Sequence, residues 1–225
     1  MPAGQPGTVS RERYVQALGG LDPIESMHKV PKRLKKLLKD VSEKRLAARP
    51  LPGKWSIKEV VAHLADHEIV LGTRFRFVAA LDRPPITGYD QDLFVERLGV
   101  DKTNTADLLK DFTSVRKANV RLLQRLPLEA RTRVGVHSER GEESLEDMIV
   151  MYAGHDLIHL AQIERMLEEA AAASKRQKRE KRQLRAGKTR SQRLKPHKRN
   201  GKKAKAPVLG APEAEVGMAE PAPAG

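Results

Sequence analysis

The chain of 225 residues is long enough for one domain with a full core and an appendage, and its 39% hydrophobic but only 4% aromatic content suits a helical bundle built on Leu, Val and Ala. It has no cysteine, which excludes disulfides, thiolate zinc sites and cysteine nucleophiles, so any metal ion must be held by histidine, carboxylate and water. The sequence has no run of eighteen apolar residues and no apolar stretch near Met1, so we expect a soluble cytoplasmic protein without a membrane span or signal peptide.

The net charge of +14 is concentrated in one segment. Residues 1–173 carry 27 Lys and Arg against 25 Asp and Glu, whereas residues 174–205 carry 16 Lys and Arg against Glu180 alone. We therefore expect three parts: a flexible lead-in (1–9), a nearly neutral folded domain (10–173) and a disordered tail (174–225), first rich in Lys and Arg and then in Pro and Ala.

In chain order, the first predicted element is a short helix from Ser10 to Leu18, which Gly19-Gly20 ends. A first long helix follows from Ile24 to about Asp40. Its start is well marked, because Asp22-Pro23 is an N-cap followed by proline at the first helical position.

A second long helix is predicted from Ser56 to about Leu81, because Ser56 and Glu59 have the spacing of a capping box. A third helix runs to Leu126 from a cap at Thr103 or Thr105. The long connection between the two has only a short apolar patch.

Residues 127–142 are expected to be a loop in which Val134 to His137 can pair briefly as a strand. The fourth helix begins at Ser144, whose hydroxyl can cap the amide of Asp147, and its apolar pattern continues to about residue 173. Four amphipathic helices predict an all-α four-helix bundle, for which a simple up-down-up-down order is one topology.

Two histidines lie at the edge of the apolar face of the fourth helix. That face follows the helical period through Leu145, Met148, Ile149, Tyr152, Asp156, His159, Leu160, Ile163, Met166 and Leu167. His155 and His159 are four residues apart, so their rings lie one above the other, roughly 6 Å apart by the helical rise. Because imidazole is a common ligand of zinc, nickel and iron, this pair is a candidate metal site.

A third ligand is available on the second long helix, which carries His63 and His67. Spacing alone does not choose between these two histidines. Either one, added to the later pair, gives a three-histidine site with open coordination positions, the layout of a catalytic rather than a closed structural site.

These residues resemble the DinB/YfiT superfamily of metal-dependent hydrolases. The resemblance rests on Trp55-Ser56 followed by His63-Leu64 and Asp66, and on His155 with His159 and Gln162-Ile163 about ninety residues later. It covers roughly residues 11–170. Relatives in this superfamily include bacillithiol S-transferases and mycothiol-dependent maleylpyruvate isomerase.

The resemblance implies a four-helix bundle with up-down-down-up topology. It also implies that the metal ligands are His63, His155 and His159, and that the ion is divalent, zinc or nickel. The resemblance further implies a homodimer. The relatives suggest a small-molecule substrate and a low-molecular-weight thiol as co-substrate.

Other polar residues near the motifs allow a structural interpretation as well as a functional one. Trp55 is expected to fix its loop onto the bundle more than to stack on a substrate. His28 is expected to be a solvent-edge or ordinary packed histidine, and His137 a surface residue rather than a ligand. Three carboxylates beside the histidines are either solvated or hold the ligand rings by hydrogen bonds: Asp66, Glu68 and Asp156.

The basic segment from Lys175 to Lys205 has almost no apolar residues, so it is disordered or a solvated helical extension. So many cations attract any polyanion, which predicts non-specific contact with nucleic acid. No interleaved aromatic residues supply base stacking.

Two classes of function follow. In the first, the protein is a metal-dependent enzyme, a thiol S-transferase or a hydrolase, in which the ion activates a small thiol or water as the nucleophile. In the second, it is a non-catalytic metal-binding stress-response protein whose basic tail binds nucleic acid non-specifically. Open coordination positions favour the first class, and the lack of an evident protein acid or base in the motifs favours the second.

Overall fold

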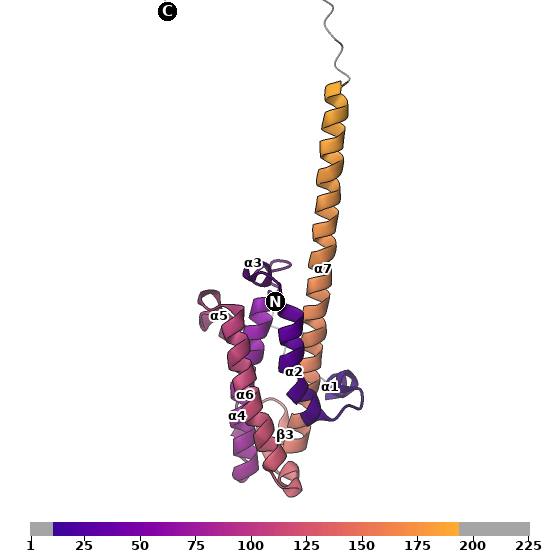
Figure 1. Cartoon of the computed structure of the whole chain (residues 1–225). Coiled ribbons are helices and arrows are strands. Elements are labelled where there is room, and N and C mark those ends of the chain that lie inside the picture. Colours follow the sequence, from indigo (N-terminus) through magenta and orange to yellow (C-terminus); the bar gives the residue numbers. More distant parts are fainter. Residues whose placement is uncertain (1–10, 194–225) are drawn as a thin grey trace, which may run out of the picture. The chain divides into compact units, whose positions relative to one another are not determined.

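Four long helices form the folded part of the protein in a computed structural model that describes residues 11–193 (Figure 1). They are α2 (Pro23–Leu38), α4 (Ile57–Ala80), α6 (Thr105–Arg125) and α7 (Leu145–Arg193), preceded by the short α1 (Arg11–Leu18). The predicted all-α four-helix bundle is confirmed.

The helices follow one another in an up-down-down-up order. Helix α2 runs toward the end of the bundle that carries α3 (Glu43–Leu46), and α4 returns from there (Figure 1). The long connection after α4 then carries the chain back through α5 (Gln91–Arg97) and the short 3₁₀ helix η1 (Val100–Lys102). Consequently α6 runs in the same direction as α4, and α7 runs in the opposite direction. The up-down-up-down alternative is wrong.

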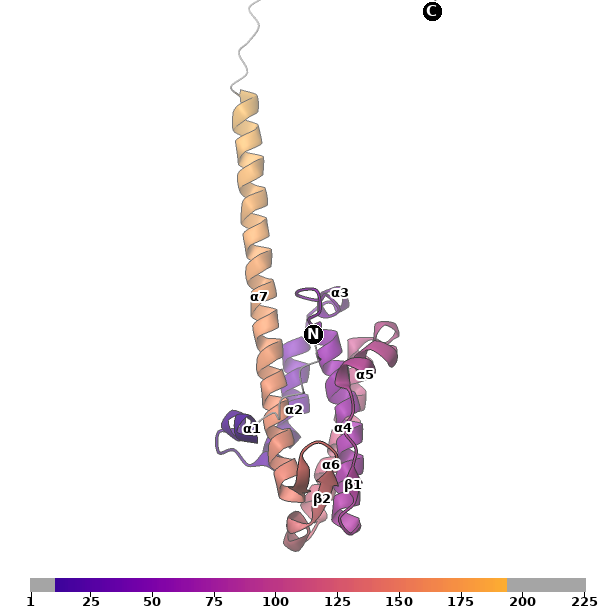
Figure 2. The ribbon, with the colours of Figure 1, turned by 180° about the vertical axis from the view of Figure 1, so that it is seen from behind.

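A small three-stranded sheet lies at the other end of the bundle (Figure 2). Strand β1 (Pro85–Ile86) pairs in parallel with β2 (Val134–His137), which pairs antiparallel with β3 (Gly141–Ser144). The predicted strand at Val134–His137 is therefore confirmed, whereas β1 and the 3₁₀ helix η2 (Leu128–Thr132) had no sequence signal that we recognised.

Three of the four predicted helix starts have the expected cap. Asp22 accepts a hydrogen bond from the Glu25 amide (2.6 Å), and Ser56 and Glu59 form the reciprocal capping box. The Ser144 hydroxyl accepts from the amide of Asp147 (3.0 Å). The predicted cap of α6 is wrong, because Asn104 rather than Thr103 or Thr105 accepts from the Asp107 amide (2.9 Å).

The apolar faces of the helices meet in two clusters of buried side chains. One cluster contains Met27, Leu71, Phe75, Leu145 and Met148, and the other contains Val30, Leu34, Val60, Leu64, Phe112, Leu160 and Ile163. Complete burial of each such side chain contributes about 1.5–3 kcal/mol relative to exposure. These contacts set the spacing of α4 and α7, the helices that carry the candidate ligands.

A buried arginine connects all four long helices. Arg116 of α6 donates to Asp156 of α7 (2.5 and 3.1 Å), to Glu68 of α4 (2.6 Å) and to the carbonyl oxygen of Met27 in α2 (3.1 Å). Burial raises the pKa of Glu68, although Arg116 opposes that shift. If a helix moved away from Arg116, an uncompensated buried charge would remain, which is strongly destabilising. The hydrogen bonds of Arg116 therefore favour one relative position of the four helices.

The chain divides into two compact units, Met1–Gln177 and Lys178–Gly225. Within the described residues the basic segment continues helix α7 as far as Arg193. Of the two alternatives for this segment, disorder or a solvated helical extension, the structure shows the helix. The side chains of residues 175–184 are exposed. The predicted disorder of residues 194–225 and of the lead-in lies outside the described residues. No helix in the described range is long and apolar enough to cross a bilayer.

Candidate metal centre

Three histidine side chains from two helices meet inside the bundle. The Nε2 atom of His155 on α7 lies 3.2 Å from Nε2 of His63 on α4 and 3.1 Å from Nε2 of His159 on α7. One nitrogen from each ring lies within 4.8 Å of the other two. The structure thus brings together His63, His155 and His159, the three residues that the family resemblance implied.

The spacing of these nitrogens suits a divalent ion with open coordination positions. Zinc–nitrogen bonds of about 2.0–2.1 Å at tetrahedral angles separate neighbouring ligand nitrogens by about 3.3 Å. The two Nε2–Nε2 distances from His155, 3.1 and 3.2 Å, are close to that separation. Three imidazoles without a fourth protein ligand are the donor set of an open zinc site.

The ring of His159 is oriented by Gln162, one turn further along α7. The His159 Nδ1–H group donates to Oε1 of Gln162 over 2.8 Å. In the neutral ring this leaves the lone pair on Nε2, the atom that faces the other histidines. A hydrogen bond of this kind to the remote nitrogen is what usually orients a metal-bound histidine.

The cluster is buried and electrically neutral. Burial, together with a smaller effect of repulsion by nearby His159, lowers the pKa of His63 to about 3. Burial likewise lowers the pKa of His155 and of His159. At neutral pH the three rings therefore carry no charge, which is the form that binds a metal ion.

His67 lies beside the cluster but is not part of it. Its Nδ1 atom is 2.5 Å from the hydroxyl of Tyr89, and its buried Nε2 atom has no hydrogen-bond partner among the described residues. Its ring stacks on His63 with the ring centroids 5.4 Å apart. The group of nitrogens that lie within 4.8 Å of one another contains His63 and not His67.

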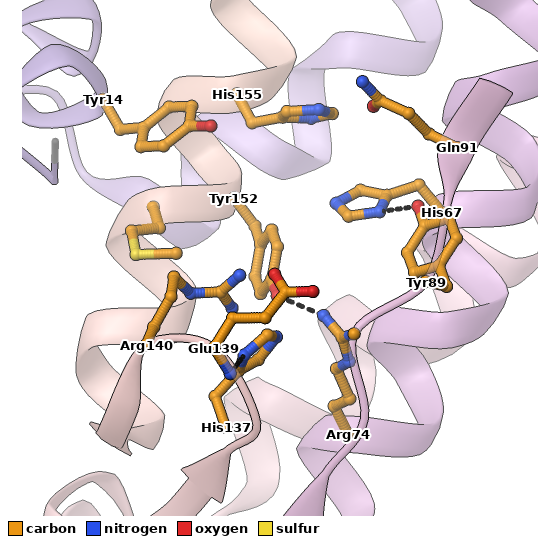
Figure 3. A pocket seen from close by; sticks show the side chains of 12 residues that line it. Tyr14, His67, Arg74, Tyr89, Gln91, His137, Glu139, Arg140, Tyr152 and His155 are labelled. Carbon is orange, nitrogen blue, oxygen red and sulfur yellow. Dashed lines mark hydrogen bonds between the residues drawn. The ribbon is translucent and has the colours of Figure 1, made fainter. Parts of the chain in front are cut away.

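Two pockets adjoin the histidine cluster. His155 forms part of the wall of a cavity of about 140 Å³, which we call the polar pocket (Figure 3). His159 forms part of the wall of a second cavity of about 560 Å³, which we call the Trp55 pocket because Trp55 also lines it. The Trp55 ring lies 5.1 Å from the ring of His63. Trp55 therefore contacts a candidate ligand as well as its own loop.

Half of the residues that line the polar pocket come from segments that we predicted to be loops or connections. Its polar residues include Tyr14, Arg74, Tyr89, His137, Glu139, Arg140 and Tyr152. We expected His137 to be a surface residue, which is wrong, because it is 2% exposed on β2. The sequence carried no signal for this, because alternation along Val134–His137 would turn the two valines inward, whereas Val136 is 38% exposed and His137 is on the inner side.

The carboxylates next to the ligands do not touch the ligand rings. Glu68 and Asp156 are buried and bind Arg116. Asp66 is half-buried, and no hydrogen bond joins it to a histidine of the cluster in the part of the chain that the structure describes. His28 is exposed on α2, as expected.

The fold and site define a class of protein: an up-down-down-up four-helix bundle with three histidines converging from its second and fourth long helices. The sequence profile of the DinB superfamily matches residues 26–163. The chain belongs to the DinB superfamily.

Individual relatives agree with this assignment. Proteins of Bacillus cereus and Bacillus thuringiensis, each named "putative metal-dependent hydrolase", are 31% identical over 144 residues, which is 62% of this chain and 80% of theirs. Among solved structures, YfiT from Bacillus subtilis, described as a probable metal-dependent hydrolase with an unusual four-helix bundle topology, superposes with a TM-score of 0.61. That likeness covers 76% of this chain and 93% of YfiT at 20% identity, and it supports the fold.

Proposed function

We propose that the protein is a metal-dependent enzyme in which His63, His155 and His159 hold one divalent ion, zinc or nickel. The observation that carries the proposal is the approach of the three Nε2 atoms at 3.1 and 3.2 Å. When bound, such an ion supplies Lewis acidity and lowers the pKa of water or of a thiol, so that either one is a nucleophile at neutral pH.

The residues of this chain contribute binding, orientation and exclusion of water. Burial keeps the three imidazoles neutral, and Gln162 holds the hydrogen of His159 on Nδ1, away from the cluster. The polar pocket and the Trp55 pocket give a substrate two approaches to the histidines. A substrate that occupied both pockets would therefore have its reactive bond at the histidine cluster.

Hydrolysis is the reaction that we propose first, because the relatives are named as hydrolases. Transfer to a low-molecular-weight thiol is the second form of the same chemistry. The two differ only in the nucleophile, and the Trp55 pocket, with about 560 Å³, is large enough to take a whole small molecule.

Metal content tests the site. Protein purified without an affinity tag should contain about one zinc or nickel ion per chain, and the double variant His155→Ala, His159→Ala should contain none. His63→Ala should lose more metal than His67→Ala, and exposed His28→Ala is the matched control. An unchanged metal content in the double variant would refute the site.

Activity tests the reaction. The metal-loaded protein is incubated with ester and amide substrates, and separately with the electrophile monochlorobimane and a panel of thiols that includes bacillithiol and mycothiol. Hydrolysis without thiol that is lost in His159→Ala supports the hydrolase, and conjugation that needs a thiol supports the transferase. If neither is accelerated and no small molecule binds, the non-catalytic metal-binding role replaces the enzyme.

A further inference from the structure

The polar pocket contains a buried positive charge without a carboxylate partner. Arg74 of α4 is 7% exposed, and it donates to the Tyr152 hydroxyl (2.9 Å) and to the carbonyl oxygen of Thr87 (2.6 Å), both neutral acceptors. Among the described residues it forms no salt bridge, whereas the more deeply buried Arg116, 1% exposed, has two. A buried charge is costly unless an opposite charge accompanies it, so Arg74 lacks a counterion.

A second buried donor faces the same pocket. Nδ1 of His137 accepts a hydrogen bond from the Glu139 amide (3.1 Å), so in the neutral ring the hydrogen is on Nε2. That Nε2 atom is buried and has no partner in the described part of the chain, although the residue is only 2% exposed. An unpaired buried donor costs about as much free energy as a lost hydrogen bond, which a ligand with acceptor atoms would recover.

The other charges of the pocket do not supply the missing counterion. Arg140 is paired with Glu143 through two hydrogen bonds, so this pair is neutral overall. The Glu139 carboxylate reaches into the pocket, against Gly88 (Figure 3), but forms no ion pair with either arginine among the described contacts. Glu139 is exposed, so it lies where a ligand would enter.

The size of the pocket limits what it binds. Its volume of about 140 Å³ is well below the roughly 300–1,000 Å³ of sites that enclose a whole drug-sized ligand. It therefore has room for a small anionic end group. His155 belongs both to its wall and to the histidine cluster, so that end group would lie directly beside the proposed ion.

We propose that the polar pocket binds the carboxylate of a small carboxylic acid substrate, through Arg74 and the Nε2–H group of His137. This substrate class rests on the proposed function, since the bond that reacts lies at the histidine cluster. A carboxylate has two coplanar acceptor oxygens that suit a guanidinium group. A phosphate dianion fits less well, because the pocket has one uncompensated cation and the Glu139 carboxylate would repel the second charge.

Direct binding of acetate to the full chain tests the proposal without any need for activity. Titration followed by saturation transfer to the methyl protons gives the affinity of acetate and of acetamide, the uncharged probe of the same size. Inorganic phosphate, the dianion, has no such protons, so its affinity is measured from its displacement of acetate. We expect acetate to bind at least tenfold more tightly than acetamide or phosphate. The chain is measured both metal-free and zinc-loaded.

The two metal states separate this proposal from the proposed function. Acetate that binds the metal-free chain supports the pocket even if the protein proves to hold no metal. Acetate that binds only the zinc-loaded chain is a ligand of the ion, which overturns the pocket proposal and leaves the metal site intact. Equal binding of acetamide also overturns it.

Two variants with opposite effects locate the binding. Arg74→Gln should weaken acetate binding about tenfold or more, and Arg76→Gln, two residues along α4 and bonded to Gly72 and Asn119 outside the pocket, should leave it unchanged. Glu139→Gln should strengthen acetate binding, because it removes a like charge from the entrance. If Arg74→Gln does not fold, Glu139→Gln decides, and an unchanged or weaker affinity in that exposed variant contradicts the proposal.

Discussion

At the scale of single residues, the orientation of His159 depends on a neutral neighbour. Gln162 accepts the Nδ1–H group of His159 over 2.8 Å and is part of the Gln-Ile pair that marked the site in the sequence. Loss of such a hydrogen bond usually lowers metal affinity tenfold to a hundredfold, because the ring then samples other orientations and its other tautomer.

Gln162→Ala should accordingly weaken zinc binding by about ten- to a hundredfold, less than His159→Ala, which removes the ligand itself. Competition with a chromogenic chelator measures the affinity. Gln162→Glu keeps an acceptor at the same place and should recover most of the loss. Equal affinities of Gln162→Ala and the parent protein would show that this hydrogen bond does not orient the ligand.

The buried imidazoles also make the metal-free protein sensitive to acid. Burial lowers the pKa of each histidine in the cluster, so below about pH 6.5 the unfolded chain binds more protons than the folded chain. The free energy of unfolding should therefore be highest above pH 6.5. It should fall between about pH 6.5 and 4.5 by up to roughly 1.4 kcal/mol per pH unit for each histidine.

Urea denaturation of the metal-free chain at several pH values measures this dependence. His159→Ala has one buried imidazole fewer and should show a shallower slope over the same range. Exposed His28→Ala serves as the control and should keep the slope of the parent protein. A stability that is flat between pH 6.5 and 4.5 would contradict the burial of neutral rings.

The identity of the ligands was predictable only in part from residues. The pair His155 and His159 followed from helical spacing, but His63 and His67 face the same region, and only the family resemblance favoured His63. In the structure the Nδ1 atom of His67 is 2.5 Å from the hydroxyl of Tyr89, in the connection after α4, and the nitrogens that converge are those of His63, His155 and His159. No local pattern in that connection predicts where its side chains lie, because they are placed by packing against residues distant in sequence.

At the scale of secondary-structure elements, α1 lies directly against α7 at Gly154. A Cβ atom at this position would overlap the backbone of Tyr14 in α1. Glycine is otherwise about 1 kcal/mol less favourable than alanine inside a helix. Its presence next to His155 is therefore explained by the close approach of α1, which brings Tyr14 to the polar pocket.

Gly154→Ala should separate α1 from the bundle without unfolding it. Faster amide hydrogen exchange in residues 11–18 is the expected signal, with unchanged exchange in α4 and α6. A variant that lacks residues 1–18 provides the control. In that background Gly154→Ala should raise the free energy of unfolding by about 0.5–1 kcal/mol, because only the helical preference remains. Destabilisation in both backgrounds would mean that α1 is not the cause.

The long helices were predictable because their signals are local. Capping residues and the helical period gave the starts of α2, α4 and α7. The cap of α6 was missed since Thr103, Asn104 and Thr105 are all capping residues, and the hydrogen bond to Asp107 selects the middle one. Helices α3 and α5 were missed because four and seven residues are too few to show a period.

At the scale of the whole molecule, the basic segment is separable in composition from the bundle. The described part of it, residues 175–184, exposes its side chains. We expect that mild trypsin leaves a fragment of about residues 1–173 with unchanged helicity per residue and melting temperature. A fragment that unfolds would show that the predicted domain boundary is wrong.

The same truncation tests the contact with nucleic acid. Binding of the full chain to duplex DNA should weaken steeply with salt, because it would come from counterion release, and it should be absent from the fragment. Retention of the binding by the fragment would place it on the bundle, which is nearly neutral.

The fluorescence of Trp55, the only tryptophan in the sequence, can report on the occupancy of the histidine cluster. Trp55 lies 5.1 Å from the His63 ring, so all tryptophan fluorescence comes from one indole beside a candidate ligand. Paramagnetic nickel bound to the histidines should quench this emission strongly, whereas zinc, with its filled d shell, should change it much less. Competition between the two ions can thus be followed in the unlabelled protein, and the fraction of occupied chains read from its emission.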